Sequence, residues 1–310
     1  MSREQMMDRF QIHPAAQIAH VELQAVDLAN MVGFYGGLLG LQVIDVQGDR
    51  AWLSATGKTP ALLTLVERKD ARPHPSTSFA AGLYHTAFRF PDRGALATML
   101  MRIVASGWPL QGASDHRVSE AIYLADPEGN GIELYRDRPR EQWPRLQGSI
   151  EMGNLPLDLR KLLEEGDQEK AQAAKVDQGT DIGHVHLQVS NLATAQAFYH
   201  DLLGLDIVMS MPTALFMSAG GYHHHLGANT WHSLNAPRRE SDATGLKSYA
   251  FMIPGEANWL ELYKRLRKSG QELQAIEREG HPGVALDDQD GIRIELLTAE
   301  TEAVHKTQAS

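Results

Sequence analysis

Histidine is the residue type through which this sequence is best equipped to do chemistry. The 310 residues include 14 histidines and no cysteine. The lack of cysteine excludes disulfides, thiolate zinc sites and cysteine nucleophiles. Imidazole binds transition metals and titrates near neutral pH. Metal binding and acid–base catalysis are therefore the chemistries to look for.

Several of these candidates lie in segments with the alternation of a half-buried strand. His20, Glu22 and Gln24 share one face of such a segment, and apolar residues form its other face. His85 lies in the similar segment LYHTAFRF, and Glu133 is the one charged residue of GIELY. A polar strand face opposite an apolar one is typical of the lining of a solvated cup.

Two more residues precede Glu133 in the same part of the chain. His116 comes just before the expected last hairpin and could transfer a proton, because its pKa lies near neutrality. Tyr123 lies ten residues before Glu133 and could donate a hydrogen bond to a bound phenolate. The alternatives are that His116 is a loop residue capped by Asp115 and that Tyr123 is a half-buried aromatic residue.

The chain repeats itself at a nearly constant offset. His20 matches His184 at an offset of 164, and Glu133 matches Glu295 at an offset of 162. Between them, GLYHTAFRFP at Gly82 matches GLKSYAFMIP at an offset of 163. Such regularity over three separate segments predicts two domains of one topology.

Each repeat is expected to hold two βαβββ units, so the predicted fold is α+β with four such modules paired into two tandem domains. In the first unit Asp27 is a suitable cap for a helix that Gly40 ends. The connector is polar and is expected to contain one helix, Leu157–Glu165. The expected division is an N-terminal extension at 1–17, a first domain at 18–137, a connector at 138–180, a second domain at 181–298 and a tail at 299–310.

These features together resemble the vicinal-oxygen-chelate superfamily, which includes glyoxalases, bleomycin-resistance proteins and extradiol dioxygenases. The resemblance covers about residues 18–137 and 182–298. The segments DHRVSEAIYLADPEGNGIELYRDRP and GGYHHHLGANTW are similar to the bacterial catechol-2,3-dioxygenase-like branch.

The resemblance implies a metal site in the first domain. In the family, the positions of His20, His85 and Glu133 hold the metal, and two imidazoles with one carboxylate form the facial set of ferrous oxygenases. Fe(II) is the implied metal, with Mn(II) as a substitute. His116 and Tyr123 then become the expected catalytic residues.

The second domain is expected to differ. Its equivalent set includes Ser248, which cannot replace an imidazole. The run His223-His224-His225 offers another arrangement in which His184, His225 and Glu295 bind a metal. The other interpretation is that these histidines, with His186 and Trp231, line a metal-free pocket or the domain junction.

The expected function is extradiol ring cleavage, in which a small aromatic diol and dioxygen are the substrates. One alternative is a glyoxalase-type lyase or isomerase that uses Zn or Ni and normally needs four protein ligands. The segment Ala61–Leu65 offers no fourth ligand in the first domain. The other alternative is a metal-free protein that binds a small molecule.

Charge composition limits which classes of binding partner the chain is expected to have. The sequence has 29 basic and 39 acidic residues, a net charge of −10, and no basic run. This pattern argues against nucleic acids and anionic membranes as partners. No segment is apolar enough for a signal peptide or a membrane span, so a cytoplasmic location is expected. Assembly into a homo-oligomer is compatible with the sequence.

Overall fold

The computed structural model describes residues 9–74, 77–240 and 242–299. The first eight residues of the expected N-terminal extension, and all of the expected C-terminal tail except residue 299, lie outside these residues. No helix in the described part of the chain is long and apolar enough to cross a membrane.

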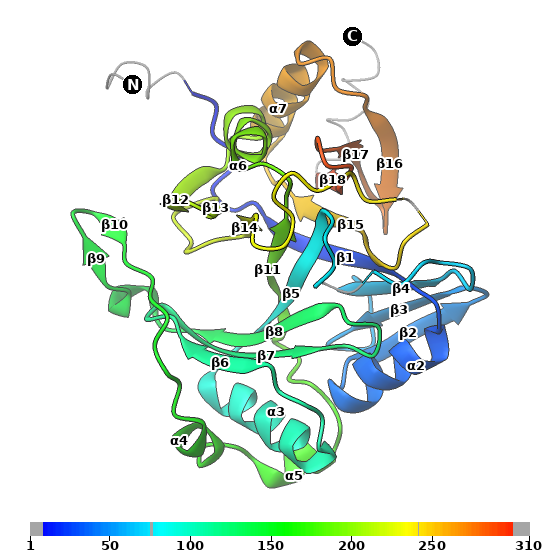
Figure 1. Cartoon of the computed structure of the whole chain (residues 1–310), viewed down its shortest axis with the longest axis vertical. Coiled ribbons are helices and arrows are strands. Elements are labelled where there is room, and N and C mark those ends of the chain that lie inside the picture. The colour runs from blue at the N-terminus through cyan, green and yellow to red at the C-terminus, as the bar shows by residue number, and fades with distance from the viewer. Residues whose placement is uncertain (1–8, 75–76, 241, 300–310) are drawn as a thin grey trace.

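Four modules with the order strand, helix, three strands make up the fold, as the sequence predicts (Figure 1). Module one contains β1 (Gln17–Ala25), α2 (Leu28–Val32) with a π-helical continuation (Gly33–Leu38), β2 (Gln42–Gln47), β3 (Arg50–Ser54) and β4 (Leu63–Glu67). Module two contains β5 (Gly82–Phe90), α3 (Arg93–Ser106), β6 (Gly112–Asp115), β7 (Ser119–Ala125) and β8 (Gly131–Asp137).

The second half repeats this order. Module three contains β11 (Asp181–Gln188), α6 (Leu192–Ala195) with a π-helical continuation (Gln196–Leu202), β12 (Asp206–Met211), β13 (Ala214–Ser218) and β14 (Leu226–Asn229). Module four contains β15 (Gly245–Met252), α7 (Glu256–Lys268), β16 (Gln274–Arg278), β17 (His281–Asp287) and β18 (Arg293–Leu297).

The connector is more structured than the sequence indicates. It contains a short 3-10 helix (Arg140–Gln142), a small hairpin of β9 (Arg145–Leu146) and β10 (Ser149–Ile150), and the helices α4 (Leu159–Leu163) and α5 (Gln168–Gln172). The expected helix over Leu157–Glu165 corresponds to the shorter α4, which begins after Asp158 accepts hydrogen bonds from two backbone amides.

The modules combine into two eight-stranded sheets across the two halves of the sequence. One sheet has the strand order β16-β17-β18-β15-β1-β4-β3-β2 and joins modules one and four. The other has the order β12-β13-β14-β11-β5-β8-β7-β6 and joins modules two and three. We call the concave faces of these sheets cup one and cup two. The expectation that modules one and two share a cup is therefore corrected by the strand pairing.

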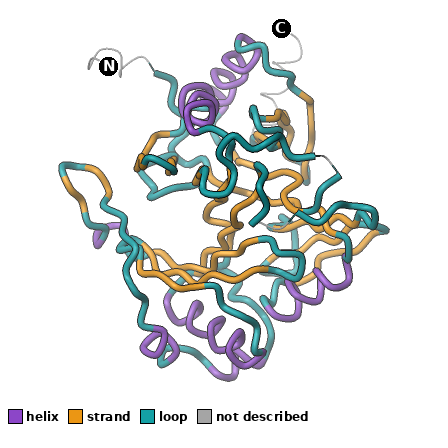
Figure 2. The backbone as a smooth tube through the Cα atoms, in the orientation of Figure 1, coloured by secondary structure: helices purple, strands orange, loops and turns teal. Residues whose placement is uncertain are grey.

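Helices lie at the periphery and strands at the centre of the molecule (Figure 2). Local signals explain the helix starts: Asp27 accepts a hydrogen bond from Asn30 N before α2, and Asp92 accepts one from Ala95 N before α3. The α3 helix contacts β5 and β8 on the face opposite cup two. Each sheet is thus covered on one side, which leaves its concave side for polar residues.

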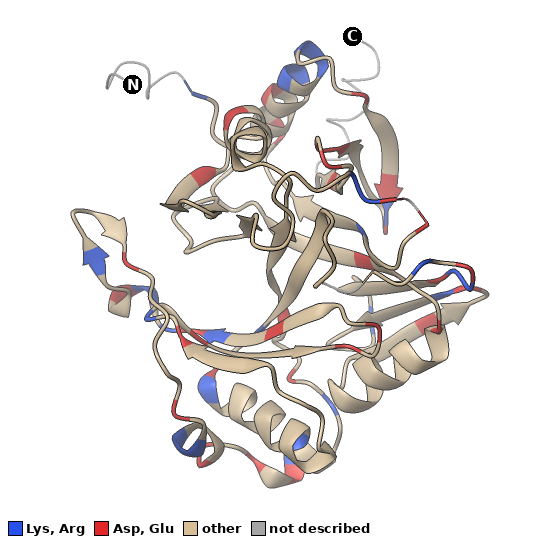
Figure 3. Cartoon of the chain, viewed as in Figure 1, with Lys and Arg blue, Asp and Glu red and all other residues tan. Residues whose placement is uncertain are grey.

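Acidic and basic residues are interspersed over the outer helices and loops, whereas the strands are largely uncharged (Figure 3). Burying an ionised side chain is unfavourable unless it is paired. The few carboxylates buried in the sheets, Glu22, Glu120, Glu133 and Glu295, therefore need partners, and these partners define the sites described next.

Candidate metal centre

Three potential metal ligands meet on the concave face of cup two. They are His85 on β5, Glu133 on β8 and His184 on β11, and one ligand atom from each lies within 4.8 Å of the others. Oε2 of Glu133 is 3.0 Å from Nε2 of His85 and 3.1 Å from Nε2 of His184. All three side chains are buried, and among the described residues this is the one group with such spacing.

Strand register explains why these residues meet. β5 pairs with β8 in parallel, so that Ala87, two residues after His85, lies opposite Glu133. β5 also pairs with β11 in antiparallel, so that Ala87 lies opposite His184. Because alternate residues of a strand point to the same face, all three ligand side chains project into cup two.

The structure brings His85 and Glu133 together as expected but places His20 elsewhere. His20 is on β1 of the other sheet, where its Nε2 atom lies 3.0 Å from Arg278. The place expected for His20 is taken by His184. The reason is the exchange of modules, because the first strand beside β5 comes from module three.

The alternative second set is not brought together either. His184 lies beside Glu133, whereas Glu295 accepts hydrogen bonds from Ser248 and Arg278. His225 accepts a hydrogen bond from the backbone amide of Ala219 at 3.2 Å, so its imidazole is used within the loop.

The electrostatics of cup two fit a divalent cation. Burial alone would raise the pKa of Glu133, but the two imidazoles beside it hold that pKa well below its usual range. Burial lowers the pKa of His184 to about 4, which keeps the imidazole neutral and able to donate a lone pair. Nε2 of His85 is buried and has no hydrogen-bond partner despite its closeness to Glu133. A metal ion would satisfy this atom.

The fourth ligand position of the set carries neither a carboxylate nor an imidazole of the last strand. Gly227 of module three corresponds to Glu133 of module two. Glu133 pairs with Ala87, two residues after His85, and Gly227 pairs with His186, two residues after His184. A Cβ atom at Gly227 would lie 2.8 Å from the His186 ring, closer than real contacts allow. Cup two therefore supplies three protein ligands and no carboxylate at the fourth place.

His116 and Tyr123 form a hydrogen-bonded pair beside this centre. Nε2 of His116 lies 2.6 Å from the Tyr123 hydroxyl, and Nδ1 of His116 lies 2.7 Å from the carbonyl of Gly153. Tyr123 on β7 is directly opposite Glu133 on β8. Burial, and then the nearby Glu133 charge, raises the pKa of Tyr123 well above its usual value. The tyrosine is therefore held neutral.

Aromatic and imidazole rings line the rest of cup two. The His224 ring lies 4.0 Å from the His184 ring, and the His186 ring lies 4.9 Å from the His85 ring. Further rings of the wall are those of Tyr84, Phe216 and Trp231. His224 belongs to the run of three histidines noted in the sequence, but no sequence pattern indicates its place beside the His184 ring.

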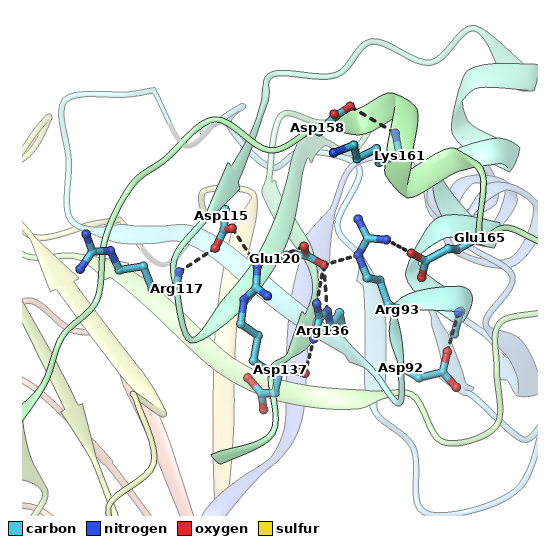
Figure 4. Close-up of polar contacts among 12 residues, drawn as sticks. Asp92, Arg93, Asp115, Arg117, Glu120, Arg136, Asp137, Asp158, Lys161 and Glu165 are labelled. Carbon is cyan, nitrogen blue, oxygen red and sulfur yellow. Dashed lines mark hydrogen bonds and ion pairs between the residues drawn. The ribbon is translucent and has the colours of Figure 1, made fainter. Parts of the chain in front are cut away.

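A buried ion cluster supports the hairpin that carries His116 and Tyr123 (Figure 4). Oε2 of Glu120 on β7 accepts hydrogen bonds from Arg93 at 2.7 Å and from Arg136 at 2.7 and 2.9 Å. Arg138 donates to both Glu120 and Asp115. Glu120 and Tyr123 are three residues apart on β7, so their side chains point to opposite faces of the sheet. The cluster therefore lies on the helix-covered face.

Both halves of the chain are similar in sequence to known proteins. A sequence model of the Glyoxalase/Bleomycin resistance protein/Dioxygenase superfamily matches residues 17–134 and 181–296. The chain is 41% identical over 269 residues to the catechol-2,3-dioxygenase of Bacillus subtilis (strain 168), which covers 86% of this chain and 93% of that protein. It is 27% identical to biphenyl-2,3-diol 1,2-dioxygenase 3 of Rhodococcus globerulus over 43% of this chain and 70% of that protein.

Solved structures share the fold. A Bacillus subtilis protein described as a candidate dioxygenase superposes with a TM-score of 0.62 at 15% identity, covering 96% of this chain and 88% of that one. Glyoxalase I from Zea mays superposes with a TM-score of 0.54 at 14% identity, covering 94% of this chain and 95% of that one.

Proposed function

Because the chain belongs to the Glyoxalase/Bleomycin resistance protein/Dioxygenase superfamily, we propose that cup two is the active site of an extradiol ring-cleaving dioxygenase. The substrate is a catechol-like aromatic diol, and dioxygen is the co-substrate. The identity to a catechol-2,3-dioxygenase over most of both chains supports this reaction class.

One observation carries the proposal beyond the family. Cup two offers two imidazoles and one carboxylate, from His85, His184 and Glu133. The strand position of a fourth ligand holds Gly227, which has no side-chain ligand atom. An Fe(II) ion on these three ligands would have positions for both diol oxygens and for dioxygen, and it would conduct electrons from the diol to dioxygen. Mn(II) fits the same ligands.

The remaining residues of cup two orient the diol and move its protons. When a neutral His116 carries its proton on Nδ1, beside the Gly153 carbonyl, Tyr123 is the donor to Nε2, so the tyrosine oxygen can accept a hydrogen bond from a substrate hydroxyl. His116 would take the proton as the diol binds and return it when the ring opens. His224, against His184, is a second histidine able to contact the substrate.

The overall change is balanced without a further reductant. The C–C bond next to the two hydroxyl-bearing carbons breaks, and both oxygen atoms of dioxygen enter the product. An unsubstituted catechol gives a yellow semialdehyde that carries one carboxylate and one aldehyde.

The test compares metals and substrates side by side. Protein loaded anaerobically with Fe(II) should consume one dioxygen per catechol, whereas Zn-loaded protein should consume none, because zinc has no redox chemistry. A hemithioacetal under nitrogen tests the glyoxalase alternative. Activity confined to the Zn or Ni form and independent of oxygen would replace the proposal by a lyase or isomerase. A lack of bound metal and of any activity would favour a small-molecule-binding protein.

A further inference from the structure

Cup one repeats the positions of the metal set with a changed set of residues. Ala250 on β15 lies opposite both His20 and Glu295, just as Ala87 on β5 lies opposite both His184 and Glu133. His20 and Glu295 therefore correspond to His184 and Glu133. Ser248, two residues before Ala250, takes the place that His85 has in cup two.

The guanidinium group of Arg278 lies between these corresponding residues. It donates to both carboxylate oxygens of Glu295, at 2.7 and 2.8 Å, and its Nη1 lies 3.0 Å from Nε2 of His20. Nδ1 of His20 lies 3.0 Å from the Ala61 carbonyl. Nδ1 therefore carries the proton, and the lone pair on Nε2 faces Arg278. The two atoms that would bind a metal are both occupied by the guanidinium.

Arg278 reaches the cup from the strand position that His116 occupies in cup two. Arg278 is the last residue of β16 and His116 directly follows β6. Each lies 17 positions before the carboxylate of its module, since 295 − 278 and 133 − 116 are both 17. In cup two the corresponding hairpin contacts the connector, where His116 Nδ1 lies 2.7 Å from the Gly153 carbonyl. In cup one the hairpin contacts module one, where the Glu279 carboxylate accepts a hydrogen bond from the Ala61 amide.

The charges of cup one also need an internal cation. Glu22 and Glu295 are both buried there. Arg278 contacts Glu22 at 3.2 Å in addition to Glu295, and Lys247 contacts Glu22 at 2.9 Å. Two carboxylates out of water are stable only when cations face them, and Arg278 is the cation shared by both.

We infer that cup one is a latent divalent-metal site in which Arg278 takes the place of the metal ion. The wild-type chain then binds one metal, in cup two. Cup one gains a metal when Arg278 is shortened and Ser248 is replaced by histidine, because the new imidazole, together with His20 and Glu295, would restore the two-histidine, one-carboxylate set. The inference rests on the metal set proposed for cup two, but it can fail independently.

The test counts metal ions per chain with Co(II) absorption titration and elemental analysis. The double variant Ser248→His/Arg278→Ala should bind one more Co(II) than the wild type, and its thermal unfolding midpoint should rise when the metal is added. The matched control Ser248→His keeps Arg278 and should bind the wild-type number. A folded double variant with no gain of metal would overturn the inference.

The outcomes separate the two cups. If the wild type binds no metal but the double variant binds one, the proposal for cup two fails and the inference for cup one stands. If the wild type binds two, and His20→Ala removes one of them, Arg278 does not replace a metal.

A measurement on the unaltered protein covers the case in which the double variant does not fold. Hydrogen exchange of the wild type should slow on metal addition in β5, β8 and β11 and remain unchanged in β1, β15 and β18. Metal-dependent protection of the second group of strands would contradict a cup already filled by Arg278.

Discussion

The hydroxyl group of Tyr123 lies 2.6 Å from Nε2 of His116. In a neutral His116 the hydroxyl is the donor, because the single ring proton lies on Nδ1, 2.7 Å from the Gly153 carbonyl, which can only accept. The lone pairs of the tyrosine oxygen therefore remain available to a substrate hydroxyl. A proton can pass from the diol to Tyr123 as the tyrosine passes its own to His116, without a phenolate being formed.

We expect His116→Ala to lower kcat by about 10²- to 10⁴-fold, the usual contribution of a general acid–base residue. Tyr123→Phe should reduce kcat in the same way, and the double variant should be little worse than either single variant because the two residues act as one relay. Metal content should stay at the wild-type value, since neither residue belongs to the metal set. Steady-state oxygen uptake and elemental analysis provide the two measurements.

His232→Ala is the matched control for this relay, because His232 is exposed and its removal should change neither quantity. Loss of metal in His116→Ala would instead identify His116 as a ligand.

Metal retention should separate the two histidines that correspond in the repeat. His184→Ala removes one of three ligands from cup two, so we expect loss of tightly bound metal and of ring cleavage. His20→Ala leaves cup two intact and should retain both. The opposite result would move the metal to cup one. His85→Ala and Glu133→Ala should behave like His184→Ala.

Sequence patterns identified the strands, the repeat and two of the three residues now proposed as ligands, because these signals are local. Alternation along β5 and β8 is enough to place His85 and Glu133 on a polar face. The superfamily resemblance is confirmed by the family match over both halves of the chain. No local sequence pattern specifies which module supplies the first strand that pairs with β5.

The choice of partner strand determines which residue becomes the third proposed ligand. β5 pairs with β11 of module three, while β1 of module one pairs with β15 of module four. Both arrangements satisfy the same alternation, so the repeat offset alone cannot distinguish them. The sequence shows that Ser248 replaces a histidine in the second ligand set. The role of Arg278 cannot be seen there, because it depends on a contact with His20, 258 positions away.

The ion cluster under the hairpin that carries His116 and Tyr123 should be important for stability. Glu120→Ala leaves the buried Arg136 guanidinium without its carboxylate, and removal of one partner of a buried pair costs about 3–5 kcal/mol. The free energy of unfolding, measured by urea denaturation, should fall by this amount. Glu165→Ala is the control, because it removes a second carboxylate from Arg93 at the surface and should cost at most about 1 kcal/mol. Equal losses would show that burial of the pair does not matter.

Stability should also depend on pH through His225. Burial, followed by the charges of His223 and Arg89, lowers the pKa of His225 to about 3. The unfolded chain therefore binds a proton on this imidazole as pH falls below about 6.5, whereas the folded chain does not. Protons then favour unfolding, so the stability present above pH 6.5 is lost progressively on acidification.

His225→Asn should flatten this dependence. Oδ1 of asparagine can replace Nδ1 as the acceptor for the Ala219 amide, but asparagine does not titrate. At about 1.4 kcal/mol per pH unit, the wild type should lose on the order of 3 kcal/mol more than the variant between pH 6.5 and pH 4. Urea denaturation in the presence of a chelator, at half-unit steps of pH, measures the difference without a contribution from bound metal. His232→Asn, at an exposed position, should follow the wild-type curve. Parallel curves for His225→Asn and the wild type would mean that His225 is protonated as readily in the folded chain as in the unfolded one.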